Sequence, residues 1–96
     1  MIGREGIVSG IRPEQIERKL EAAFAPTRLK VIDESEQHRG HGGWREGGGT
    51  HYRVVMRATA FAGMSRVARS RAVHVALAEE LAGGVHALAL DLAPPD

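Results

Sequence analysis

The chain contains no cysteine, and this absence limits what a sequence of its length can fold into. Domains too small to build an adequate core are often held together by disulfides or by a zinc–thiolate centre, and both are excluded here. The 96 residues must therefore form one domain around a single hydrophobic core, for which a hydrophobic content of 43% suffices. A soft metal or cluster would find only imidazole ligands here, so any thiolate would come from a partner.

Charge and hydropathy exclude several classes of protein. The formal net charge of +1 is too small to indicate nucleic-acid or membrane binding by itself. The first residues lack the apolar segment of a secretory signal, and no apolar run approaches the roughly 20 residues of a membrane span. We therefore expect a cytoplasmic protein of bacterial type with no targeting segment and no membrane partner, which is a monomer or a weak homodimer when alone.

Hydrophobic periodicity predicts five elements in the order helix, strand, strand, helix, strand. They are expected at residues 11–25, 28–33, 50–59, 66–81 and 85–92. Pro13 suits the first turn of the first helix, and Ser65 suits the N-cap of the second. The apolar stripe expected on the second helix consists of Val67, Val73, Leu77 and Leu81.

Between the first two strands lies a glycine-rich stretch, residues 40–49, of which six are glycine. This composition predicts a flexible loop with Trp44 as its only large apolar side chain. The loop matches no phosphate-binding pattern, because it lacks the Gly-Lys-Ser/Thr ending and leads into a strand. The predicted fold is α+β, with a three-stranded mixed sheet packed against helices in a single domain whose core spans about residues 11–92.

The histidines are the residues that suggest metal chemistry. His38 and His41 lie three residues apart before and within the loop, where they can reach one ion or remain solvated. His86 lies at the start of the third strand and is either a ligand or a half-buried histidine satisfied by one hydrogen bond. We expect a structural role for His51 and a place at the edge of the packed helix face for His74.

No arrangement of residues indicates catalysis. Residues 33–35 read Asp-Glu-Ser and are followed by His38, but neither a nucleophile elbow nor oxyanion donors accompany them. The glutamates show no spacing that would bring two carboxylates onto a substrate. We therefore expect a protein that is not an enzyme.

A single basic cluster, Arg66, Arg69 and Arg71, lies near the start of the second helix. Arg66 and Arg69 share a helix face at a spacing of three residues, so they can contact phosphates. The alternative is an ordinary solvated face whose charge is offset by Glu79 and Glu80 downstream.

Taken together, these segments resemble the BolA-like family, in its histidine-loop, BolA1-type branch. The matching segments are residues 16–20, 29–35 leading to His38, 50–54, 61–69, 77–81 and 85–90. The Asp-Glu-Ser, Thr-His and Val-His-Ala-Leu motifs occur in the family's order. The resemblance implies a fold similar to a type II KH domain. It also implies a partner, a monothiol glutaredoxin with a CGFS-type active site.

The resemblance further implies that the two proteins hold a bridging [2Fe-2S] cluster, and that this chain alone has no cofactor. The glutaredoxin cysteine and bound glutathione would supply the thiolates. By motif, His86 is the C-terminal ligand and His38 the loop ligand, with His41 as an alternative in the loop. The implied role is iron–sulfur cluster trafficking or iron-status regulation.

A second function is implied because some family members are linked to transcriptional control. The chain would then be a KH-like regulator that binds DNA through Arg66, Arg69 and Arg71. One departure bears on this alternative, because residues 61–65 lack the Gly-x-x-Gly of KH domains. A second departure, Arg-Ser-Arg at residues 69–71 in place of the Arg-His-Arg of many relatives, removes the middle histidine without touching the implied ligands.

Overall fold

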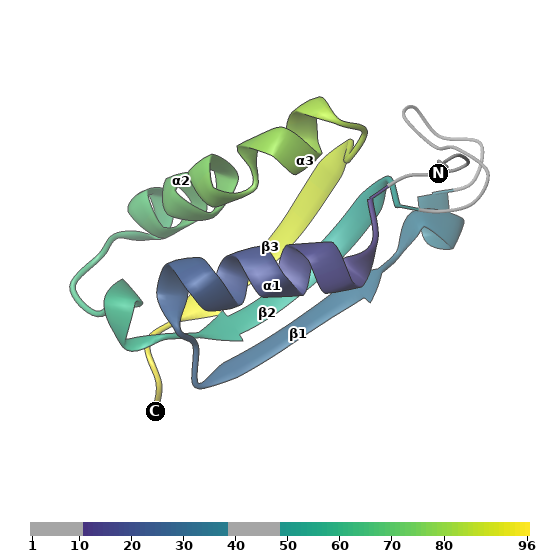
Figure 1. Cartoon of the computed structure of the whole chain (residues 1–96). Helices are drawn as coiled ribbons and strands as arrows, with labels where there is room; N and C mark the ends of the chain where they lie inside the picture. The colour runs from purple at the N-terminus through teal and green to yellow at the C-terminus, as the bar shows by residue number, and fades with distance from the viewer. Residues whose placement is uncertain (1–10, 39–48) are drawn as a thin grey trace.

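The computed structural model describes residues 11–38 and 49–96, which form a three-stranded sheet with helices packed on it (Figure 1). The predicted α+β class and order are confirmed. The elements are α1 (Pro13–Phe24), β1 (Arg28–Asp33), the 3-10 helix η1 (Ser35–His38), β2 (His51–Arg57), the 3-10 helix η2 (Thr59–Phe61), α2 (Arg66–Ala76), α3 (Ala78–Ala82) and β3 (Ala87–Ala93). The predicted glycine-rich loop, with Trp44 and His41, lies almost entirely outside the described residues.

The sheet is mixed, as predicted, with strand order β1-β2-β3. β1 runs antiparallel to β2, and Val31 pairs with Val54 at the centre of this register. β2 runs parallel to β3, and the same Val54 pairs with Leu90. A parallel pair needs a crossover connection, which α2 and α3 supply.

The core lies between one face of the sheet and the helices. Alternate residues of β2 point to opposite faces, and Tyr52, Val54 and Met56 are buried while Arg53 between them is exposed. α1 contributes Ile16 and four residues later Leu20, both with no exposed surface. The remaining buried apolar residues are Ala58, Phe61, Val73, Leu77 and Val85.

The two ends of α1 are set by local chemistry. Pro13 occupies the first turn, as predicted, where its missing N–H costs nothing. At the other end Ala25 takes the left-handed conformation, with φ 46°, and its amide bonds to the carbonyl of Glu21. Pro26 prevents continuation, so the helix is shorter at both ends than the predicted 11–25.

The single second helix predicted over residues 66–81 is wrong in detail, because the chain breaks into α2 and α3 at Leu77. The predicted N-cap is confirmed, since the hydroxyl of Ser65 accepts a hydrogen bond from the amide of Ala68 at 3.1 Å. Val67 does not belong to the buried stripe and is 60% exposed. At about 100° per residue it lies about 240° around the helix from the buried Val73. Among the described residues, no helix has both the length and the apolar character that crossing a membrane requires.

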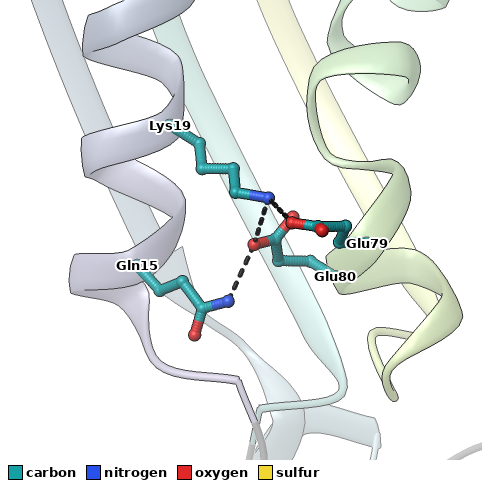
Figure 2. Close-up of polar contacts among 4 residues, drawn as sticks. All are labelled: Gln15, Lys19, Glu79 and Glu80. Carbon is teal, nitrogen blue, oxygen red and sulfur yellow. Dashed lines mark hydrogen bonds and ion pairs between the residues drawn. The ribbon is translucent and has the colours of Figure 1, made fainter.

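A polar cluster joins α1 to α3 inside this fold. Figure 2 shows Gln15 and Lys19 of α1 pointing toward Glu79 and Glu80 of α3. The side chain of Glu80 is fully buried, and its Oε2 accepts hydrogen bonds from Gln15 Nε2 at 2.8 Å and Lys19 Nζ at 3.1 Å. Lys19 also pairs with the exposed Glu79. The other oxygen of Glu80, Oε1, has no hydrogen-bond partner among the described residues.

Candidate functional site

His86 is held where the turn after α3 meets the start of β2. Gly84, with φ 135°, closes this turn in a conformation that suits glycine, and the amide of Val85 bonds to the carbonyl of Glu80 at 3.0 Å. The amide of His86 then donates to the carbonyl of Thr50 at 2.7 Å. β3 begins one residue later, at Ala87, rather than at the predicted residue 85. The backbone of His86 is thus fixed while its side chain is exposed.

The neighbour of His86 is a second histidine, His51, the first residue of β2. The two imidazole rings lie 5.3 Å apart between centroids, at an angle of 52°. His51 is only 5% exposed, and its Nδ1 shares a hydrogen bond of 2.8 Å with the hydroxyl of Thr50. The structural role expected for His51 is therefore supported by its burial and by its contact with the exposed ring of His86.

The start of β2 is in turn tied to the end of β1 by Asp33 and Ser35. The Ser35 hydroxyl donates to Asp33 Oδ1 at 2.5 Å and accepts from the amides of Thr50, at 2.9 Å, and His51, at 3.2 Å. Asp33 Oδ1 also accepts from the amide of Ser35, and its Oδ2 accepts from the amide of Gly49 at 3.0 Å. These bonds fix both ends of the connection between β1 and β2.

The same contacts change the acidity of Asp33. Burial by itself raises the pKa of this carboxyl, but the hydrogen bonds from Ser35 and Gly49 outweigh burial, and the net pKa lies below its ordinary value. Asp33 is therefore a carboxylate throughout the neutral range. It is a stable acceptor for the amides around it.

The histidines predicted from the loop lie at and beyond the boundary of the described residues. His38 is the last residue of η1, which starts at Ser35, and His41 lies outside the described residues. Within residues 11–38 and 49–96 no three histidine, aspartate or glutamate side chains form a metal-binding group. The assignment of His38 or His41 as the loop ligand stays a prediction. The remaining histidine, His74, is exposed on α2, and its Nδ1 lies 2.8 Å from the carbonyl of Ser70.

The three arginines of the predicted basic cluster are divided between two sides of α2. Arg66 and Arg69 line a groove of about 700 Å³ between α2 and β3. Arg71 instead lines a shallow apolar hollow with Phe24 of α1. Arg69 is half-buried, and its Nη1 donates to the carbonyl of Leu92 at 3.1 Å. Only two of the three guanidinium groups therefore share a surface.

Comparison with known proteins shows the family and the fold of this chain. A sequence model of the family described as BolA-like protein matches residues 20–96. The chain belongs to the BolA-like family. The BolA domain of SufE1 from Arabidopsis thaliana superposes with a TM-score of 0.80 at 38% identity, covering 92% of this chain and 96% of that one.

Two relatives show how BolA-like sequences similar to this chain are described. A Sinorhizobium protein described as an uncharacterized protein in the cobS 5′ region is 54% identical, over 85% of this chain and 89% of that protein. The DNA-binding transcriptional regulator BolA of Escherichia coli strain K12 is 44% identical, over 80% of this chain and 70% of that regulator.

The sequence singled out His86 as a candidate ligand but did not indicate the residues that hold its backbone and the start of β2 in place. Ser35 and Thr50 are named there as parts of family motifs, with no structural contact predicted for either. A signal for the first was present, because an aspartate two residues before a serine commonly forms a turn through its side chain, as Asp33 does with the amide of Ser35. The bond from His86 to Thr50 joins residues far apart in sequence, and no local pattern predicts it.

Proposed function

We propose that this BolA-like chain is a non-enzymatic partner of a CGFS-type monothiol glutaredoxin, with which it holds a [2Fe-2S] cluster in iron–sulfur trafficking or iron-status regulation. The observation that carries the proposal is His86. Its imidazole is exposed, its backbone is fixed on Thr50, and its ring nitrogens have no hydrogen bond within the described residues. A ring of this kind has a nitrogen ready to bind a metal from outside.

The donors of this chain fit such a shared cluster. Thiolates are the usual ligands of iron–sulfur clusters, and histidine replaces some of them where a higher potential is needed. With no cysteine, this chain contributes imidazole alone, and the glutaredoxin cysteine and glutathione supply the thiolates. His51 lies beside His86, with the two ring centroids 5.3 Å apart. His38, or His41 in its place, supplies the second ligand from the connection between β1 and β2.

Anaerobic reconstitution tests this proposal. The chain is mixed with a CGFS monothiol glutaredoxin, glutathione, iron and sulfide, and the visible absorption and circular dichroism are compared with those of the glutaredoxin alone. We expect a changed spectrum and a heterodimer on a sizing column. His86→Ala should abolish the change, and either His38→Ala or His41→Ala should alter it.

His74→Ala is the matched control, because His74 is also an exposed histidine but lies on a different element, α2, and its Nδ1 lies 2.8 Å from the carbonyl of Ser70. It should leave the spectrum unchanged. If His86→Ala also leaves the spectrum of the mixed complex unchanged, the ligand assignment is wrong. If no complex forms, the partnership is wrong.

A second candidate function is DNA binding, favoured by the description of the Escherichia coli relative and by the exposed Arg66. Phosphate contacts release counterions, so the affinity for duplex DNA should fall steeply with salt. Replacing Arg66, Arg69 and Arg71 together by alanine should weaken binding and reduce the salt slope. An affinity that is the same for this variant and the native chain would exclude these arginines as the contact surface.

A further inference from the structure

The groove between α2 and β3 has walls of different chemistry. Arg66, Arg69 and His74 line the α2 side, and Leu88, Leu90 and Asp91 line the β3 side. Its volume of about 700 Å³ is large enough for a chain segment or a small ligand. The groove begins on β3 at Leu88, two residues after His86, but His86 does not line it, and the proposed glutaredoxin partnership leaves it without a role.

The groove carries positive charge that nothing in the described residues neutralises. Arg66 is exposed and has no ion pair there. Arg69 uses one nitrogen on the carbonyl of Leu92, and its buried Nε has no hydrogen-bond partner. Asp91, the acidic residue of the groove, is already paired with Arg57 at 3.2 Å. The unmatched charge favours an acidic ligand.

The strand on one side of the groove, β3, has an edge that is unpaired among the described residues. β3 is at the edge of the sheet, so one of its sides has no neighbouring strand in the described part of the chain. Arg69, on the groove side, bonds to the carbonyl of Leu92. Orientation along a strand repeats every two residues, so the backbone groups of Leu90 and Leu88 face the same side as that carbonyl. An edge of this kind is a template for another extended chain.

We propose that this groove binds an extended acidic segment of a partner protein, which pairs with β3 at Leu88 and Leu90 as a fourth strand and places its carboxylates on Arg66 and Arg69. Main-chain hydrogen bonds supply affinity in this mode, and side chains supply selectivity. A single-stranded nucleic acid fits less well, because the groove is lined by no phenylalanine, tyrosine or tryptophan and His74 is the one ring among its described lining residues that could stack on a base. The proposal is independent of the cluster and of His86.

A short fluorescein-labelled peptide of alternating glutamate and leucine is the probe, with binding followed by fluorescence anisotropy at low salt. Two further peptides carry N-methyl groups on every second residue, one on the odd and one on the even positions. A strand donates to its neighbour through alternate amides only. We therefore expect one methylated peptide to bind at least about tenfold more weakly and the other to bind within about threefold of the parent.

Variants on α2 locate the site. Arg66→Glu should weaken peptide binding at least about tenfold, whereas Arg71→Glu, the same charge change on the other side of the same helix, should change it less than about threefold. Circular dichroism verifies that both variants are folded. In the native chain, the peptide should slow hydrogen exchange at the amides of Leu88 and Leu90.

Four results would overturn the proposal. The peptide fails to bind at about 1 mM; both methylated peptides bind alike; Arg66→Glu and Arg71→Glu have equal effects; or a short oligothymidylate binds more tightly than the peptide and displaces it from the groove. The last result would assign the groove to nucleic acid. None of them bears on whether His86 binds a cluster.

Discussion

Two carboxylates, Asp33 and Glu80, each join parts of the chain that are distant in sequence, but their partners differ. Asp33 accepts from the backbone amides of Ser35 and Gly49 and from a hydroxyl. Glu80 accepts from the side chains of Gln15 and Lys19. A backbone amide moves only with the chain, whereas a long side chain can rotate. Asp33 therefore fixes the path of the backbone beside the candidate site, while Glu80 attaches one helix to another.

The two carboxylates also differ in how completely they are satisfied. Both oxygens of Asp33 are hydrogen-bonded, but Glu80 is fully buried and its Oε1 has no partner among the described residues. Burying an ion costs free energy that only a complete set of hydrogen bonds offsets. We therefore expect the Asp33–Ser35 network to stabilise the fold strongly. Glu80 should contribute little net stability, although removal of one of its hydrogen-bond donors should destabilise the fold.

The largest effect is expected from Ser35→Ala. The buried amides of Thr50 and His51 would both lose their acceptor, and the free energy of unfolding should fall by about 3 kcal/mol. Urea denaturation followed by circular dichroism measures this change. Ser70→Ala, on α2 and far from this network, is the control and should change stability by less than about 0.5 kcal/mol. If the Ser35→Ala and Ser70→Ala variants are equally stable, the Asp33–Ser35 network does not stabilise the fold strongly.

A smaller loss is expected from Gln15→Leu, which takes one donor away from the buried Glu80. A hydrogen bond to a charged group contributes about 2 kcal/mol, and the variant should lose about that much stability in urea. The double variant Gln15→Leu/Glu80→Leu should recover most of the loss, because two apolar side chains then replace the buried ion and its donor. If the double variant is no more stable than Gln15→Leu alone, Glu80 makes a net contribution to the free energy of unfolding besides attaching α1 to α3.

The smallest effect is expected in the pH dependence of stability. Burial raises the pKa of Glu80, but the hydrogen bonds from Gln15 and Lys19 outweigh it, so its net pKa, like that of Asp33, is below the ordinary value. The folded protein therefore binds fewer protons than the unfolded chain in the acidic range. Stability from both groups is complete above their ordinary pKa values and is lost as the pH falls through the lowered ones.

Urea denaturation at a series of pH values from neutral down to about pH 3 measures this loss. Asp33→Asn and Glu80→Gln should each flatten the curve, since each removes one titrating group. If Asp33→Asn leaves the loss of stability at acidic pH unchanged, the hydrogen bonds to Asp33 do not stabilise the fold through the charge of its carboxylate.

Local patterns predicted the strands and their order well, because alternation is a property of neighbouring residues. β1 was predicted at residues 28–33 and is found there. The break at Leu77 could not be predicted in the same way. The residues on both sides of it favour a helix, and the bonds from α1 to Glu79 and Glu80 come from residues 60 or more positions away. Contacts of this range are invisible to a window of helical periodicity.

The candidate site was predicted in the same uneven way. His86 could be singled out from its motif, but its exposure depends on the turn at Gly84 and on the bond to Thr50. Ser35 was discounted because it fits no catalytic triad, yet its burial and its two accepted amides make it the centre of the network. A polar residue with a purely structural task carries little signal in a single sequence.

The parallel pairing of β2 with β3 has a consequence for synthesis on the ribosome. β1 and β2 are complete when the chain has been made to Arg57, but His86 reaches Thr50 only after α2 and α3 have also emerged. Domains generally fold as units. The bond that holds the backbone of His86 on Thr50, and the pairing of its ring with that of His51, therefore arise only with the completed domain.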